Sequence, residues 1–165
     1  MKRLKLKIGD VFSIPITKEL MGYGQIVLAG TVQYIVAFEK AYPKEEKVDV
    51  ERIISGNIFL VGHTTDARLY HGMWKIVGNA PVPKERIPFP CYKLCQGTAD
   101  NIVVVDFEGN ILRTASKEEK QLLSYRPSFA PIRFEKALQA RHGIGSWDKD
   151  YDELTVEYAR QRVLT

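Results

Sequence analysis

Residues 23–39 read YGQIVLAGTVQYIVAFE, and this stretch predicts two neighbouring β-strands. The first predicted strand runs from Tyr23 to Leu28 and the second from Val32 to Glu39. Along the second strand an apolar or aromatic residue recurs at every other position, which places one set of side chains on a single face: Val32, Tyr34, Val36 and Phe38. The link over residues 29–31 is short and contains a glycine, so the pair is expected to form a hairpin.

The strand pattern continues on both sides of this hairpin. Before it, Leu4–Ile8 and Phe12–Ile16 alternate around the turn signal Gly9-Asp10. Because Pro15 has no backbone N–H to donate, its strand is expected to lie at a sheet edge or to end in a bulge there. After the hairpin, further strands are expected at Ile58–Val61, Met73–Val77, Cys91–Gln96, Asn101–Phe107 and Ile111–Ala115.

Helical signals concentrate in the last third of the chain. Ser116 followed by Glu119 fits a capping box, and Pro131 suits the first turn of a helix that ends near His142. A final helix is predicted after Asp150, with an apolar face formed by Tyr151, Leu154 and Tyr158. In the first half, only residues 49–55 predict a short helix.

The segregation of strands and helices favours an α+β fold, because alternating βαβ units would interleave the two. We expect a twisted antiparallel sheet or partial β-barrel in the N-terminal two-thirds, with helices in the C-terminal third. A chain of 165 residues suits a single domain over residues 1–165. Residues 1–115 would form a strand-rich core with one short helix, and residues 116–165 a helical segment packed on it.

The charge is mildly basic, with a formal net charge of +4 and a sequence pI of about 9.0. A nucleic-acid-binding domain usually gathers its positive charge on one stripe. The densest basic run here is Lys2, Arg3, Lys5 and Lys7, and elsewhere basic and acidic residues are mixed. This pattern is typical of a solvated surface and disfavours nucleic acid as a partner, although a small nucleic-acid-binding β-barrel module remains the alternative function.

The sequence also indicates a compartment. The basic start is not followed by an apolar run of the kind a secretory signal contains, and no apolar stretch is long enough for a membrane span. Cys91 and Cys95 are too few for a disulfide framework. We therefore expect a cytoplasmic protein with reduced thiols and no membrane association.

No spacing in the chain predicts a catalytic or metal site. If Cys91 and Cys95 lie on one strand, they are roughly 13 Å apart, too far to share a metal ion. A Cys nucleophile would need an adjacent His base, and no local signature supplies one. We expect no enzyme activity, no metal and no cofactor; the alternative is a dispersed site with candidates Cys91, Cys95, His63 and His71.

A binding surface is the better interpretation of the aromatic residues. Aromatic and Arg side chains are the usual anchors of protein interfaces. The most suggestive run is His71–Trp74, a glycine-containing turn with large side chains next to Arg68 and Tyr70. The predicted partner-binding residues are Trp74, Arg68, Tyr70, His71 and Tyr23.

Three stretches in this order and spacing resemble the immunity protein 26 family of bacterial polymorphic toxin systems: Gly9–Pro15 (GDVFSIP), Gly22–Val27 (GYGQIV) and Trp74–Pro81 (WKIVGNAP). The C-terminal helices carry no matching motif. The resemblance implies a strand-rich α+β fold and a small cytosolic antidote whose partner is a cognate protein toxin. It brings no catalytic residues.

The net charge departs from one expectation of such antidotes. Inhibitors of nuclease toxins are often acidic because they cover a basic nucleic-acid site, whereas this chain is net positive. Either the toxin is not a basic nuclease, or a local acidic patch serves instead. The acidic residues that cluster locally are Glu45, Glu46, Asp49 and Glu51.

Overall fold

The computed structural model describes residues 4–164, which form two compact units. Unit 1 comprises residues 4–87 and 128–156, and unit 2 comprises residues 88–127 and 157–164. The single domain over residues 1–165 stays a prediction. The α+β class is confirmed, since antiparallel sheets dominate the N-terminal part and helices the C-terminal part.

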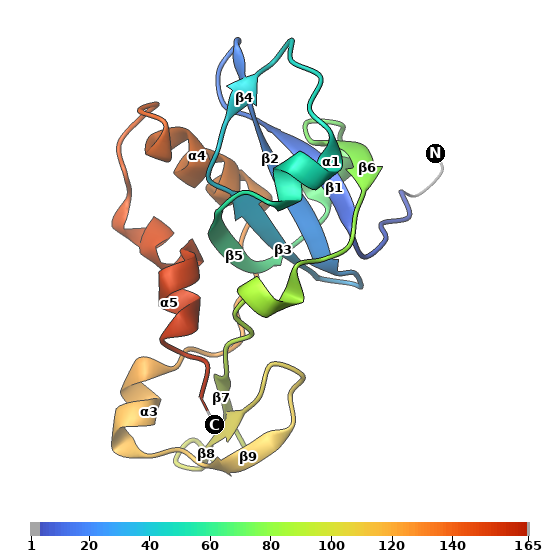
Figure 1. The fold of residues 1–165 in the computed structure, drawn as a ribbon. Coiled ribbons are helices and arrows are strands. Elements are labelled where there is room, and N and C mark those ends of the chain that lie inside the picture. Colours follow the sequence, from blue (N-terminus) through green and yellow to red (C-terminus); the bar gives the residue numbers. More distant parts are fainter. Residues whose placement is uncertain (1–3, 165) are drawn as a thin grey trace. The chain divides into compact units, whose positions relative to one another are not determined.

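Unit 1 is built on one antiparallel sheet with the spatial order β5-β3-β2-β1-β6 (Figure 1). Its strands are β1 (Asp10–Pro15), β2 (Leu20–Leu28), β3 (Gln33–Phe38), β5 (Ile58–Thr64) and β6 (Lys75–Asn79). The short β4 (Tyr42–Pro43) pairs with β2 beside this path. Within the described residues the sheet does not close into a barrel.

The predicted hairpin is the centre of this sheet. β2 and β3 pair antiparallel, with Ile26 opposite Ile35 and Gly24 opposite Ala37. A Cβ atom at Gly24 would lie 2.7 Å from the Val36 carbonyl oxygen, so only glycine allows the two backbones to approach here. The close pairing buries both strands almost completely.

Helices cover the sheet of unit 1. They are α1 (Val50–Ile54), α2 (Ala67–Tyr70) and α4 (Pro131–Arg141), together with the 3-10 turns η1 (Lys84–Arg86) and η2 (Lys149–Leu154). A further helix, α5 (Val156–Arg160), begins with the last residue of unit 1 and belongs otherwise to unit 2. As predicted, Asp49 caps α1 by accepting a hydrogen bond from the Arg52 backbone N–H. α4 places Phe134, Ala137 and Leu138 in the main core. That core also takes Phe12, Ile14, Ile26, Ile35, Leu60 and Trp74.

Two predictions at the N-terminus are wrong. Leu4–Ile8 is not a strand, because the Asp10 carboxylate accepts a hydrogen bond from the Lys7 backbone N–H and folds the segment into a turn. β1 is interior rather than an edge strand, and its bulge toward β6 lies at Val11 and Phe12 instead of Pro15. Pro15 is tolerated because the β6 pairing ends at Ser13.

The predicted final helix is also wrong. Asp148, not Asp150, caps the first turn, and the chain forms the 3-10 turn η2. Thr155 is extended and separates η2 from α5. The isolated bridge between Thr155 and Leu60 of β5 accounts for the break, since it requires extended backbone at that point.

Unit 2 has a three-stranded antiparallel sheet, β7 (Tyr92–Cys95), β8 (Ile102–Val105) and β9 (Ile111–Thr114), followed by α3 (Lys117–Leu122). The predicted β8–β9 hairpin is confirmed, as is the capping box of Ser116 and Glu119. β8 is buried on both faces: Ile102 and Val104 contact one apolar cluster, and Val103 and Val105 the other.

Unit 2 is expected to lose stability in acid. Hydrogen bonds from the Asn110 side chain lower the pKa of Asp106, and the Ser116 backbone N–H lowers the pKa of Glu119, from ordinary values of 3.8 and 4.5. A lowered folded-state pKa contributes stability above the unfolded-state value, which is lost as pH falls through the folded-state value. The protection factors of the β8 amides, which are corrected for the pH dependence of intrinsic exchange, should therefore fall below about pH 4.5.

The variant Asp106→Asn checks this origin of the acid sensitivity. It removes one titrating carboxylate, so the protection factors of the β8 amides, measured by NMR, should depend less steeply on pH. Equal pH dependence in the variant and the wild type would show that the Asp106 turn does not contribute.

Candidate partner-binding surface

A tight turn connects α2 to the edge strand β6. The backbone N–H groups of Met73 and Trp74 both donate to the Arg68 carbonyl oxygen, at 2.9 and 3.0 Å. Gly72 has a φ of +74°, a conformation that side-chain-bearing residues rarely adopt. These bonds fold residues 68–74 into a compact turn at the start of β6.

Trp74 and Glu135 anchor this turn to the core. The Trp74 ring is 2% exposed and stacks on Phe12 with ring centroids 5.1 Å apart. Its Nε1–H donates to Glu135 Oε1 at 3.0 Å, and Arg68 Nη2 donates to Glu135 Oε2 at 3.3 Å. One carboxylate on α4 thus holds two residues of the turn, one apolar and one charged.

Apolar side chains are exposed along the same segment. β6 is an edge strand that pairs with β1, and its first three residues are exposed, so side chains on both of its faces reach solvent. The exposed fractions are 44% for Tyr70, 49% for Met73, 38% for Ile76 and 48% for Val77. We call these four residues the α2–β6 edge. Exposed apolar residues gathered along one strand edge favour contact with another protein.

The predicted partner-binding residues fall into three environments. Tyr70 and His71 are exposed, with rings in edge-to-face contact at 5.0 Å. Arg68 is half-buried, and Trp74 is buried. Tyr23 lies apart on β2, 8% exposed and edge-on to Tyr42, and burial raises the pKa of its hydroxyl. Their role in binding stays a prediction.

Sequence reasoning missed several residues of this surface. Ile76 and Val77 were expected in a strand, but nothing in the pattern indicated that this strand lies at an edge. Glu135 was missed because its role depends on Trp74, which is 61 residues away along the chain. A charged residue beside Phe134, on the apolar side of a helix, is the signal that could have indicated it.

The histidines and cysteines of the alternative catalytic site either have structural contacts or belong to different units. His63 is buried against Tyr34, and His142 Nε2 lies 2.7 Å from the Glu39 carbonyl oxygen. The histidines belong to unit 1, whereas Cys91 and Cys95, both free thiols, belong to unit 2. Among residues 4–164, no group of three or more His, Cys, Asp or Glu side chains is arranged to hold a metal ion.

The acidic cluster and the basic run of the sequence can be placed in the same way. Within the acidic cluster, Asp49 caps α1 and Glu46 forms an ion pair with Arg52 at 2.7 Å. Of the basic run, Lys5 and Lys7 are exposed, while Lys2 and Arg3 lie outside the described residues.

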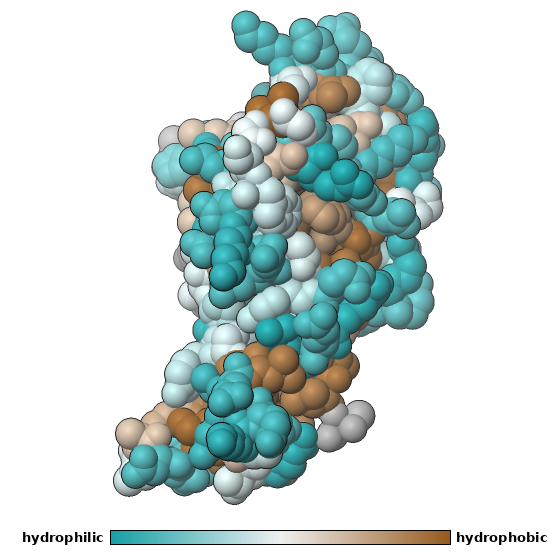
Figure 2. All heavy atoms as spheres, turned by 90° about the vertical axis from the view of Figure 1, so that its left-hand side faces the viewer, coloured by the Kyte–Doolittle hydropathy of each residue, from teal (hydrophilic) through white to brown (hydrophobic). Residues whose placement is uncertain are grey.

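Apolar exposure is not confined to the α2–β6 edge. The face turned to the viewer in Figure 2 shows brown apolar patches among teal hydrophilic residues. On unit 1, Ile144 and Trp147 are 45% and 39% exposed, and the Trp147 ring contacts Phe59 and Tyr151. Unit 2 also exposes apolar residues on its edge strands, Leu94 on β7 and Ile111 and Leu112 on β9. The α2–β6 edge differs because the turn that precedes β6 is held to the core by Trp74 and Glu135. Within the described part of the chain, no helix has the length and apolar character to cross a membrane.

Comparison with known proteins gave one match. The family model described as Immunity protein 26 matches residues 7–101, more than half of the 165-residue chain. The matched region contains all three stretches on which the sequence resemblance rested, and the resemblance is confirmed. No curated protein and no solved structure matched the chain.

Proposed function

Since this chain belongs to the immunity protein 26 family, we propose that it binds and neutralises a cognate bacterial toxin domain by protein–protein contact, without catalysis. The observation that carries the proposal is the family match together with the exposed α2–β6 edge inside the matched region. The two free cysteines favour the reducing cytoplasm as the compartment where the two proteins meet.

We place the toxin contact on the α2–β6 edge. Tyr70 offers an exposed ring, and His71 and the half-buried Arg68 flank it. Trp74 supports this surface from beneath, because its ring fills the core under the turn and its Nε1–H is held by Glu135. A rigid turn that presents aromatic and basic side chains suits an interface anchor, since little conformational entropy is lost on binding. Tyr23 is a separate candidate on β2.

The direct experiment uses the toxin domain encoded beside this gene. Co-expression of the two should restore the growth that the toxin alone prevents. The purified complex should survive high salt, because salt does not screen contacts between apolar side chains. Contacts between basic side chains and the phosphates of a nucleic acid would be weakened. Growth that is not restored, or a bound nucleic acid that high salt removes, would contradict the proposal; the second result would favour the β-barrel alternative.

Tyr70→Ala is expected to weaken toxin binding about 10-fold or more, because a central aromatic anchor contributes more than about 1.4 kcal/mol. Isothermal titration calorimetry measures the change. Tyr125→Ala is the matched control, since Tyr125 is a tyrosine of unit 2 that is exposed to a similar degree, 53% against 44% for Tyr70. Similar affinity for both variants and the wild type would place the interface elsewhere, and Tyr23→Phe would then be tested in the same way.

A further inference from the structure

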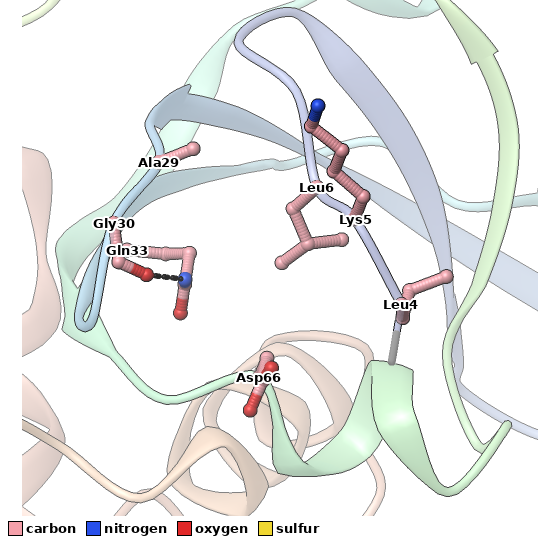
Figure 3. Close-up of a pocket in the computed structure, with 7 residues that line it drawn as sticks. All are labelled: Leu4, Lys5, Leu6, Ala29, Gly30, Gln33 and Asp66. Atoms are coloured by element: carbon pink, nitrogen blue, oxygen red, sulfur yellow. Dashed lines mark hydrogen bonds between the residues drawn. The ribbon is translucent and has the colours of Figure 1, made fainter. Parts of the chain in front are cut away.

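A hollow of about 370 Å³ opens on unit 1 beside α2 (Figure 3). Its walls come from the N-terminal segment with Leu4 and Leu6, the turn between β2 and β3, the first residue of β3, Gln33, and Asp66. The volume lies within the range of small-ligand pockets. Asp66 is the residue immediately before α2, so the hollow borders the α2–β6 edge.

Gln33 lines this hollow and carries a buried hydrogen-bond acceptor. The side chain is 4% exposed, and its Nε2 donates to the Gly30 carbonyl oxygen at 2.6 Å. That bond identifies which end of the amide is the nitrogen, because a carbonyl oxygen accepts only from an N–H. The Oε1 atom has no hydrogen-bond partner among the described residues. Buried acceptors are nearly always satisfied, so a donor from outside the described residues is expected at this atom.

Asp66 provides a second acceptor, and this one is charged. Its half-buried carboxylate does not cap α2 and forms no ion pair with any residue that the structure describes. In the view of Figure 3, Gln33 and Asp66 border the same open space, and the Lys5 ammonium points away from Asp66. Leu6 extends toward this space between them. The hollow therefore combines two acceptors, the negative charge of Asp66 and apolar walls, with the Lys5 ammonium at a distance from Asp66.

A guanidinium group fits this combination best. Its planar fork of N–H donors can reach an amide oxygen and a carboxylate together, and its aliphatic stem can lie along leucine side chains. An ammonium group supplies donors around a single point and has no flat edge to span two acceptors. We propose that the hollow beside Gln33 and Asp66 receives an arginine side chain of the cognate toxin. This inference rests on the proposed function for the source of the arginine.

The first test needs no toxin. The full chain is titrated with N-acetyl-arginine amide and, separately, with N-acetyl-citrulline amide, which has the same shape without the charge. NMR signals of the Gln33 side-chain amide and the Asp66 backbone amide should shift with the arginine probe, and the citrulline probe should bind about 10-fold more weakly. Equal binding of the two probes, or no shift at these positions, would overturn the site.

Variants establish which carboxylate is responsible. Asp66→Asn should weaken the arginine probe about 10-fold, since it removes the charge and preserves the shape. Asp100→Asn is the matched control, because Asp100 is an exposed aspartate of unit 2 and should leave binding unchanged. An unchanged affinity in Asp66→Asn would overturn the assignment of the charge to this residue.

The second test uses the toxin domain and separates this inference from the proposed function. Asp66→Asn should weaken toxin binding about 10-fold. A toxin variant that lacks the contacting arginine should bind the wild type and Asp66→Asn with equal affinity. If the toxin binds the wild type and Asp66→Asn with equal affinity, the hollow is not a toxin contact, and the proposed function stays intact. Probe binding that depends on Asp66, without any toxin binding by the wild type, would identify a small guanidinium compound as the ligand and overturn the toxin as the source.

Discussion

Replacing Trp74 by alanine is expected to lower the free energy of unfolding of unit 1 by about 3–5 kcal/mol. The ring is 2% exposed and stacks on Phe12, so truncation leaves a cavity in the main core. It also removes the Nε1–H that donates to the buried Glu135 carboxylate, which then keeps only its contact with Arg68. The loss of apolar contact and the loss of a donor act in the same direction.

Urea unfolding followed by circular dichroism measures this loss. Trp147→Ala is the matched control, because Trp147 is 39% exposed and its Nε1–H donates to Asp152 near the surface. It should cost less than half as much. Trp74→Phe should fall between the two, since it keeps an aromatic ring beside Phe12 and loses the donor. Equal costs for Trp74→Ala and Trp147→Ala would contradict the anchoring role of Trp74.

The stability result also bears on function. Because Trp74 is buried, any effect of Trp74→Ala on toxin binding would include the loosening of the turn that carries Tyr70. Tyr70→Ala removes an exposed ring without opening the core. Comparing the two variants distinguishes a residue that contacts the partner from one that positions it.

Local patterns predicted the parts of the fold that depend on near neighbours. The β2–β3 hairpin followed from two-residue alternation around a short glycine-containing link, and both strands lie within a few residues of their predicted ends. The α3 capping box followed from Ser116 and Glu119, which bond to each other's backbone. These features form from interactions between residues close in sequence, so a pattern in the sequence suffices to indicate them.

Features that depend on distant partners were not predictable. Leu4–Ile8 is a separate case with a local cause: it has a strand pattern, but the Asp10 side chain bonds to the Lys7 backbone three residues away and creates a turn. β6 has an ordinary strand pattern, and the exposure of Ile76 and Val77 depends on how little of the fold packs over the two faces of this strand. α4 packs its predicted inward residues on the sheet of unit 1, whereas the assignment of α3 and most of α5 to unit 2 depends on contacts that the sequence pattern does not indicate.

The candidate site shows the same difference between contacts that are local in sequence and contacts between distant residues. Arg68, Tyr70, His71 and Trp74 are close in sequence, and a glycine in the turn indicated that they would lie together. Gln33 and Asp66, by contrast, meet at one hollow only because β3 and β5 are neighbours in the sheet and α2 follows β5 directly. No spacing in the sequence indicates that meeting.

Glu135→Ala is expected to cost about 2–3 kcal/mol of unfolding free energy. The side chain of Glu135 is 11% exposed, so its carboxylate gains little from water and is satisfied instead by Trp74 Nε1–H and Arg68. Removing it leaves the Trp74 donor buried without an acceptor. The Arg68 side chain is 23% exposed and can turn toward solvent, which keeps the cost below that of a fully buried ion pair.

Two further variants resolve how the carboxylate acts. Glu135→Gln retains an oxygen that accepts from Trp74 and should cost only about 1 kcal/mol, because it loses the charge that pairs with Arg68. Glu157→Ala is the surface control, since the side chains of its ion pair with Arg160 are 72% and 55% exposed, and it should change stability by less than about 0.5 kcal/mol. If Glu135→Gln were as costly as Glu135→Ala, the charge pair with Arg68 would hold the turn. If both cost no more than Glu157→Ala, the turn would be held by Trp74 and Phe12 alone.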